Sequence, residues 1–280
     1  SRYYGQALQR LDPLRIAVDE SRRWSVRLFG WMRTNNYSGN VVAEFFTEHP
    51  EWHDEGEDGS PAPALCFAFP EVRAHKIAIL CEAAAYGLDG LLIDTLRHPP
   101  MVHYAPVVVN AFRAEYGEDP PREPHPTLSR QRADNRAGER WERWFRFRAR
   151  HFTTFIRELR GALVAAGMGT LPVHLRVAPR RYLHDGADLD ALLEERLIDA
   201  VVANRYTVEP LDYDLLVPVI RGRVPLCAIC DPLREDAIES LSEMARDRRL
   251  QGIGVYESEW SIHMPEHRPH LRQAAHLLRG

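Results

Sequence analysis

Four carboxylates of this chain follow short apolar runs and could supply a catalytic pair: Asp94, Asp231, Glu257 and Glu259. Each apolar run is too short for a helix and has the length of a buried parallel strand. Ligands of parallel α/β proteins bind beyond the carboxyl ends of the strands, so these side chains would gather at one edge of the sheet. Glycoside hydrolysis needs two carboxyl groups there: one donates a proton, and the other acts as nucleophile or activates water.

The sequence suggests a role for each member of this pair. We expect Asp94 to act as nucleophile or charge stabiliser, because Arg97 follows closely and would keep it ionised. We expect Glu257 to donate the proton, because the flanking Tyr256 and Trp260 would raise the pKa of its carboxyl by excluding water.

Strand parity leaves a second assignment open. If Gly252, Gly254 and Tyr256 face the interior of a barrel, Glu257 points toward the helices. Asp231 then becomes the better proton donor. Two of these carboxylates also have a purely structural interpretation: Asp94 as the cap of its loop, paired with Arg97, and Glu257 as a loop residue that pairs with an arginine.

Polar and aromatic side chains near the predicted strand ends are the candidate substrate-binding residues: Trp31, Arg33, Arg97, His98, Arg176, Asn204, Tyr206 and Tyr256. The two-residue period of a strand places His174 and Arg176 on one face, and Asn204 and Tyr206 on one face of the next strand. Inward-facing groups near the top of a barrel commonly bind substrate hydroxyls. Arg176 has a second interpretation, as the buried partner of an acid.

The elements that would position these residues alternate along the chain. Strands are predicted in the run that ends at Asp94 and at residues 26–33, 172–178, 200–206, 225–230 and 253–257. Helices are predicted at residues 13–23, 71–85, 106–116, 139–166, 189–196, 211–221, 233–248 and 269–278. Helix 139–166 has aromatic residues at three- and four-residue spacings, which indicates a core-facing stripe.

This alternation predicts an α/β fold of the (β/α)8 TIM-barrel type, as a single domain over residues 1–280. Two long loops, at residues 34–65 and 117–136, interrupt it. Trp52 and His53 in the first loop either line the site or plug the loop. Six strands are predicted where a closed barrel has eight. Either an N-terminal βαβ piece is missing from this chain, which we favour, or residues 1–10 supply irregular strands.

One region resembles a known family. It comprises Phe-Pro-Glu-Val-Arg at residues 69–73, Gly-Leu-Asp-Gly-Leu-Leu-Ile-Asp at residues 87–94, and Arg97 with Pro99. These segments resemble the bacterial family 10-like glycosylhydrolases, which are TIM barrels. The chain departs from that pattern at Phe69, where the family usually has Asn, and at Ile93, where it has an aromatic residue. The resemblance implies an exported glycosidase that acts on an oligo- or polysaccharide.

Composition excludes several other classes. The net charge of −4 and pI near 6.4 provide no basic field for nucleic acid, and the arginines are interleaved with acids. No apolar run approaches the roughly 18 residues of a membrane span. We therefore expect a carbohydrate substrate, with no nucleic acid or membrane partner; the oligomeric state stays open.

No metal site, cofactor or alternative nucleophile is indicated. Cys227 and Cys230 lie three apart in a strand and so point to opposite faces, which favours free thiols over a metal or redox clamp. Histidine spacings typical of metal sites, phosphate-binding glycine loops and a serine nucleophile elbow are missing. The alternative to a glycosidase is a non-catalytic carbohydrate-binding barrel, in which no second carboxyl faces Asp94.

Overall fold

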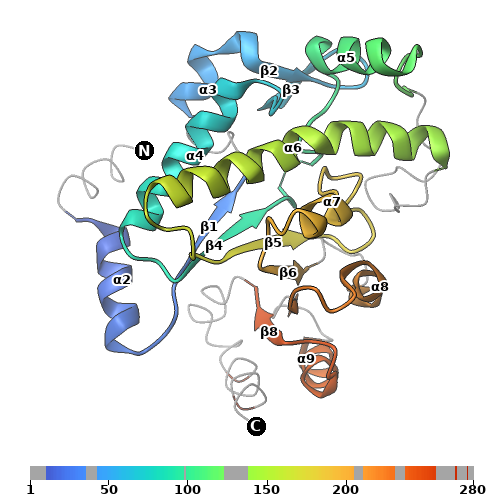
Figure 1. Cartoon of the computed structure of the whole chain (residues 1–280). Helices are drawn as coiled ribbons and strands as arrows, with labels where there is room; N and C mark the ends of the chain where they lie inside the picture. The colour runs from blue at the N-terminus through green and yellow to red at the C-terminus, as the bar shows by residue number, and fades with distance from the viewer. Residues whose placement is uncertain are drawn as a thin grey trace.

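The computed structural model describes residues 11–35, 43–97, 99–122, 138–204, 211–230 and 237–256, together with residues 269 and 276. Its centre is a sheet of six parallel strands in the order β1-β4-β5-β6-β7-β8, which curls into a partial barrel (Figure 1). The strands are β1 (Phe29–Arg33), β4 (Gly90–Asp94), β5 (Val173–Val177), β6 (Ala200–Ala203), β7 (Leu226–Cys230) and β8 (Gly252–Val255). Each predicted strand is present, so the α/β barrel prediction is confirmed as a partial barrel.

Helices precede or connect the strands of this sheet, as the βα alternation predicted. They are α2 (Pro13–Arg23), α4 (Pro70–Ala85), α5 (Pro106–Tyr116), α6 (Glu139–Ala165), α7 (Leu189–Glu194), α8 (Val217–Ile220) and α9 (Ala237–Arg246). Residues 211–221 do not form the single helix predicted, because η2 (Tyr213–Leu216) precedes a short α8 that ends where Arg221 takes a φ of 50°. The helix predicted at residues 269–278 lies almost entirely outside the described residues.

The prediction of a loop at residues 34–65 is wrong from residue 44 onward. It contains the short helix α3 (Glu44–Glu48), η1 (Pro50–Trp52) and a hairpin of β2 (His53–Glu55) with β3 (Pro61–Leu65). Gly59 takes a φ of 80° in the turn, a conformation that favours glycine. The hairpin was missed because its strands are short and rich in charge and proline, which are weak strand signals.

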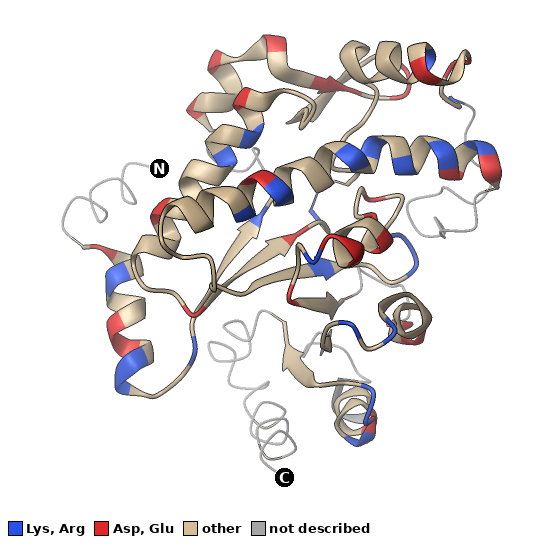
Figure 2. Ribbon diagram, viewed as in Figure 1, with Lys and Arg blue, Asp and Glu red and all other residues tan. Residues whose placement is uncertain are grey.

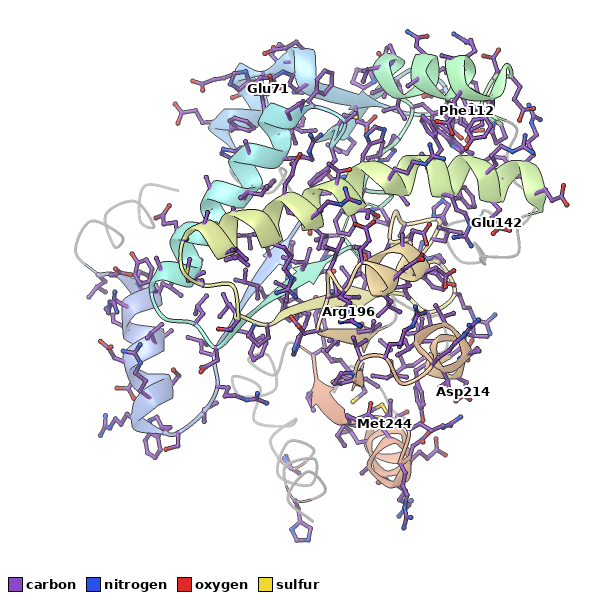
Figure 3. All side chains as sticks on the ribbon, in the orientation of Figure 1. Glu71, Phe112, Glu142, Arg196, Asp214 and Met244 are labelled. Carbon is purple, nitrogen blue, oxygen red and sulfur yellow. The ribbon has the colours of Figure 1, made fainter. Side chains whose placement is uncertain are left out.

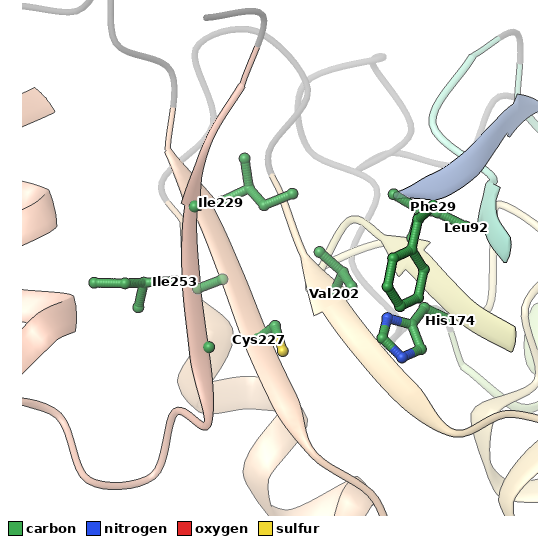
Figure 4. A pocket seen from close by; sticks show the side chains of 10 residues that line it. Phe29, Leu92, His174, Val202, Cys227, Ile229 and Ile253 are labelled. Atoms are coloured by element: carbon green, nitrogen blue, oxygen red, sulfur yellow. The ribbon is translucent and has the colours of Figure 1, made fainter. Parts of the chain in front are cut away.

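The two faces of the six-stranded sheet differ in burial. The outer face packs against helices, and its side chains, such as Leu91, Ile93 and Leu175, are fully buried. The inner face carries Leu92, His174 and Cys227, which are only partly buried. These inner residues line an apolar cavity of about 220 Å³ (Figure 4). The outer face is therefore the core, and the inner face stays open toward the cavity.

Helix α6 crosses the outer face and joins the layers (Figure 1). Its aromatic stripe is buried, as predicted, and Phe112 of α5 packs edge-on against Trp144 and Phe147 (Figure 3). The opposite side of α6 is rich in arginine (Figure 2). Arg150 pairs with Glu115 of α5 at 2.7 Å, and other arginines of α6 pair with acids near α7.

The segment between α4 and β4 owes its sequence to close contacts. Gly87 takes a φ of 87° directly after α4, where a side chain would be strained. Gly90 lies beneath the Phe29 ring, and a Cβ there would come within 2.1 Å of it. Asp89 accepts a 2.8 Å hydrogen bond from the Leu28 backbone N–H and so joins the starts of β1 and β4. These contacts give a physical reason for the Asp-Gly pair of the motif.

Arg73, the last residue of the Pro-Glu-Val-Arg motif, joins α4 to α6. Its guanidinium binds both oxygens of Glu158, at 2.7 and 3.0 Å, and donates to the backbone carbonyls of Phe67 and Ala68. The side chain of Arg73 is 9% exposed. A planar fork with several donors is needed to make all of these bonds at once, so lysine cannot replace it.

We predict that Arg73→Lys lowers the free energy of unfolding by about 2 to 4 kcal/mol, because charge-assisted bonds and buried carbonyls lose their donor. Urea unfolding measures the change. The matched control is Arg157→Lys, which breaks the exposed pair of Arg157 on α6 with Glu195 at the end of α7 and should cost less than about 1 kcal/mol. Equal losses in the two variants would contradict the role of Arg73.

Candidate functional site

Asp94 ends β4 and is fully buried at the carboxyl edge of the sheet. Its Oδ2 accepts a hydrogen bond from Arg176 Nη1 at 2.7 Å and another from Trp31 Nε1 at 3.1 Å. Its Oδ1 accepts the backbone N–H of Leu96 at 2.8 Å. The carboxylate thus caps its own loop and binds side chains from both neighbouring strands, β1 and β5.

Strand register places one arginine on each side of Asp94. Arg33 is its partner on β1, and Arg176 is its partner on β5. Register partners on parallel strands point to the same face, so the three side chains form one row across the inner face. The sequence argument assigned both arginines to substrate binding, but spacing along the chain could not show that Asp94 lies between them.

Arg176 lies between two aromatic rings. Its guanidinium carbon is 4.9 Å from the centre of the Trp31 ring and 4.7 Å from that of Tyr256. Trp31 belongs to β1 and Tyr256 follows β8, which are the two edge strands of the sheet. Their ring centres are only 5.6 Å apart, so the sheet curls far enough for side chains of its opposite edges to meet over Arg176.

The electrostatics of this cluster follow from burial. Burial lowers the pKa of the Arg176 guanidinium, and the neighbouring Asp94 carboxylate acts in the opposite direction. Arg176 is 3% exposed, and its Nε has no hydrogen-bond acceptor within the described part of the chain. Arg97 follows β4 and donates to the Tyr256 hydroxyl at 3.2 Å. Among the described residues, arginine and aromatic side chains therefore gather around the buried carboxylate of Asp94.

The parity condition that the sequence left open is met. Gly252 and Gly254 line the inner cavity, and Tyr256 contacts Arg176, so these three residues face the interior. By the sequence argument this favours Asp231 over Glu257 as proton donor. Five of the candidate residues themselves lie outside the described residues: His98, Tyr206, Asp231, Glu257 and Glu259.

Asn204 follows β6 and is 4% exposed. Its side-chain amide donates to the carbonyl of Ile229 on β7 at 3.3 Å. Asn204 thus lies at the expected end of its strand, where it links two neighbouring strands.

The loop residues Trp52 and His53 are held by packing. The Trp52 ring stacks on His49 at 3.8 Å between ring centres, and His53 Nε2 bonds the carbonyl of Phe46 at 2.8 Å. Trp52 also packs against the small cluster of Leu65 and Val72. This corresponds to the second interpretation of the loop, in which its aromatic residue plugs it.

Asp54, which the sequence argument missed, orders the loop between β4 and α5. Its carboxylate accepts three backbone N–H groups: those of Glu55 at 3.0 Å, His103 at 2.7 Å and Ala105 at 3.0 Å. Asn35 adds a bond from its side-chain amide to the Pro100 carbonyl at 3.3 Å. Two loops at the carboxyl edge are therefore bound to each other. In the sequence, the only feature that distinguishes Asp54 is its charge within a weak strand pattern.

Metal and thiol chemistry find no support in this part of the chain. Within the described ranges, no group of three or more His, Cys, Asp or Glu residues is arranged to hold a metal ion. All four cysteines are free, and Cys227 and Cys230 lie on opposite faces of β7, as predicted. No helix among the described residues is both long enough and apolar enough to cross a membrane.

Comparison with known proteins identifies solved structures that have a similar fold. The chain matches no protein-family model and no curated protein sequence. It is similar to the solved glycoside hydrolase domain of PelA from Pseudomonas aeruginosa, with 15% identity, a TM-score of 0.51, and coverage of 86% of this chain and 83% of that one. A variant of that domain matches at 16% identity with the same TM-score and coverage. The chain therefore shares its fold with the PelA domain.

We predict that Asp94→Asn lowers the free energy of unfolding by about 3 to 5 kcal/mol, because Arg176 keeps its buried charge and loses its counter-ion. Arg176→Met should destabilise by a similar amount, and the double variant by clearly less than the sum of the two. Urea unfolding of the four proteins measures this coupling.

The control for this double-mutant comparison is Asp190→Asn. Asp190 is more than half exposed and pairs with Arg146 at 3.5 Å, so its loss should cost less than about 1 kcal/mol. Strict additivity of the Asp94 and Arg176 changes would contradict a buried ion pair.

A second prediction concerns pH. Burial raises the pKa of Asp54 to about 6 from its ordinary value of 3.8. The folded protein then binds the proton of the Asp54 carboxyl more tightly than the unfolded chain does. The free energy of unfolding therefore falls as pH rises from about 4 to 6 and Asp54 ionises. We expect the difference in unfolding free energy between wild type and Asp54→Asn to fall by roughly 3 kcal/mol across that window and to stay level above it.

Asp12 provides the control for the pH experiment. This N-cap of α2 accepts the Arg15 backbone N–H, which lowers the pKa of its carboxyl. Its contribution should therefore be present above pH 4 and lost as pH falls, the opposite sign to that of Asp54. A difference for Asp54→Asn that rises with pH would contradict the assignment.

Proposed function

We propose that the protein is a glycoside hydrolase that cleaves an oligo- or polysaccharide with a carboxylate pair centred on Asp94. The observation that carries this proposal is the contact between Asp94 and an exposed aromatic ring. Trp31 is 41% exposed, and its indole N–H is bonded to Asp94 Oδ2. A flat aromatic face beside a carboxylate, at the carboxyl edge of a curled parallel sheet, suits the stacking of a sugar ring next to a reacting group.

The two oxygens of Asp94 have different tasks in this proposal. Oδ2 is occupied by Arg176 and Trp31. Oδ1 accepts only the Leu96 N–H among the described residues and has lone-pair capacity for a further partner. We assign Oδ1 to the anomeric centre of the sugar, as nucleophile or charge stabiliser.

Asp231 is the proposed proton donor, and Glu257 is the second choice. The inward orientation of Gly252, Gly254 and Tyr256 supports this order. The pair would act without a cofactor, since both halves of the reaction are proton and glycosyl transfers between carboxyl groups and water. Membership of the family 10-like glycosylhydrolases, and with it export, stays a proposal that rests on the motif at residues 69–99.

A second candidate function is non-catalytic carbohydrate binding. The complete burial of Asp94 favours it, because a carboxylate held by Arg176, Trp31 and a backbone N–H can serve simply to orient the aromatic platform. Both candidates use the same Trp31 surface. They differ in whether sugar chains are cut.

The experiment is an assay of reducing ends released from a panel of neutral, amino and acidic polysaccharides. We expect wild type to cleave at least one of them, and Asp94→Asn and Asp231→Asn to lower turnover by on the order of 10²- to 10⁴-fold. Glu115→Gln, an acid on the remote helix α5, is the control and should retain activity. The anomeric configuration of the first product distinguishes retention from inversion.

Folding of each variant is checked by its circular dichroism spectrum. A folded Asp94→Asn protein with wild-type turnover would overturn the role of Asp94. Binding of a polysaccharide that depends on Trp31, with no release of reducing ends from any member of the panel, would support the non-catalytic candidate instead.

A further inference from the structure

We infer that Trp31 is a positioning residue for Asp94 as well as the platform on which the sugar stacks. The inference rests on the proposed function, in which Asp94 Oδ1 acts on a sugar ring held by Trp31. It adds that the indole N–H, a different part of the same side chain, sets the direction in which Oδ1 points. The platform and the hydrogen bond are therefore separable, and each should affect a different kinetic constant.

The carboxylate of Asp94 needs a partner that fixes its plane. Rotation about the Cβ–Cγ bond of aspartate has only a broad, two-fold preference. Oδ2 accepts two bonds, from Arg176 Nη1 at 2.7 Å and from Trp31 Nε1 at 3.1 Å, and these donors belong to the strands on the two sides of β4. The remaining partner, the Leu96 N–H, binds Oδ1, the oxygen that must react. The two bonds to Oδ2 therefore hold the plane of the carboxylate while Oδ1 engages the sugar.

The indole of Trp31 is itself held in place. The guanidinium carbon of Arg176 lies over the ring, 4.9 Å from its centre, and Arg176 is almost fully buried. The Tyr256 ring is tilted by 59° against the indole at 5.6 Å between ring centres. Trp31 nevertheless stays 41% exposed, which leaves surface for a sugar ring. The group that binds the sugar is thus the same rigid ring that directs the carboxylate.

The placement of the reacting atoms explains why this bond should matter for the rate. Reacting atoms must approach to about 3 to 3.5 Å in the correct alignment, and a displacement of about 1 Å can lower the rate by about 10²-fold. An indole in contact with both the sugar and Asp94 sets their separation through one rigid group. Stacking acts on the ground state and the transition state alike and so changes KM, whereas the direction of Oδ1 changes kcat.

The test replaces the indole of Trp31 by benzothiophene, introduced at this position alone by nonsense suppression. Benzothiophene keeps the two fused rings and has sulfur, which donates no hydrogen bond, in place of the N–H. On a polysaccharide that wild type cleaves, we expect kcat to fall about 10- to 100-fold and KM to change by less than about twofold. Trp31→Leu, which removes both the ring and the donor, should lower kcat and also raise KM.

Trp24 provides a matched control, because its indole N–H is also bonded to a carboxylate. Trp24 Nε1 donates to Glu20 Oε2 at 3.0 Å at the end of α2, and Trp24 is exposed. It precedes β1 at the amino edge of the sheet, whereas Asp94 lies at the carboxyl edge. The same benzothiophene replacement at position 24 should leave kcat and KM within about twofold of wild type.

A spectroscopic measurement tests the hydrogen bond without turnover. The indole N–H signals of the two residues are identified in nitrogen-15 spectra by their loss in Trp31→Phe and Trp24→Phe. We expect Asp94→Asn, in a preparation that circular dichroism shows to be folded, to move the Trp31 signal, because a neutral amide replaces the charged acceptor. The Trp24 signal should stay in place. A Trp31 signal that does not move would overturn the inference.

The kinetic outcomes separate this inference from the proposed function. Cleavage with a kcat that falls by less than about tenfold when benzothiophene replaces the indole of Trp31 would overturn the inference and leave the hydrolase proposal standing. Equal losses at positions 31 and 24 would have the same meaning, and so would a rise in KM alone, since Trp31 would then be only a platform. Release of no reducing ends from any polysaccharide would contradict the hydrolase proposal and the inference together.

Discussion

Arg176 carries a full positive charge into a place that water hardly reaches, since the residue is 3% exposed. Removing a guanidinium from water costs several kcal/mol, so it needs close partners. Asp94 provides a counter-charge at 2.7 Å, and the faces of Trp31 and Tyr256 provide two cation–π contacts. Arg176 belongs to β5, and these partners come from β1, β4 and the end of β8, so the packing of one side chain depends on the curvature of the entire sheet.

The sheet uses its two faces for different purposes. The outer face is covered by helices and holds the fully buried residues. Helix α6 packs there through its aromatic residues and pairs with neighbouring elements through its arginines. The inner face is apolar toward the amino edge, where Phe29 and His174 line the cavity, and charged toward the carboxyl edge. Stability is therefore concentrated on one face, and the other is left available for a ligand.

The described parts of the loops after β4 and β5 are bound to other segments of the chain. Asp54 of the hairpin binds the backbone that leads into α5, and the Met101 N–H donates to the carbonyl of Asp185 in the loop after β5. The buried Arg148 of α6 donates to the neighbouring carbonyl of His184. These described segments are held in place before a ligand binds, which reduces the entropy lost on binding.

The sequence by itself determined the six strands, most of the helices and the position of Asp94, because local periodicity, Gly87 and the prolines are properties of neighbouring residues. It also assigned Trp31, Arg33 and Arg176 to one region. Only the tertiary structure decided how they meet. Strand register places Asp94 between two arginines, and curvature brings the two edges of the sheet together. These relations depend on residues far apart in the chain, and no local pattern encodes them. The contacts by which Asp54 anchors its hairpin likewise join residues far apart in the chain.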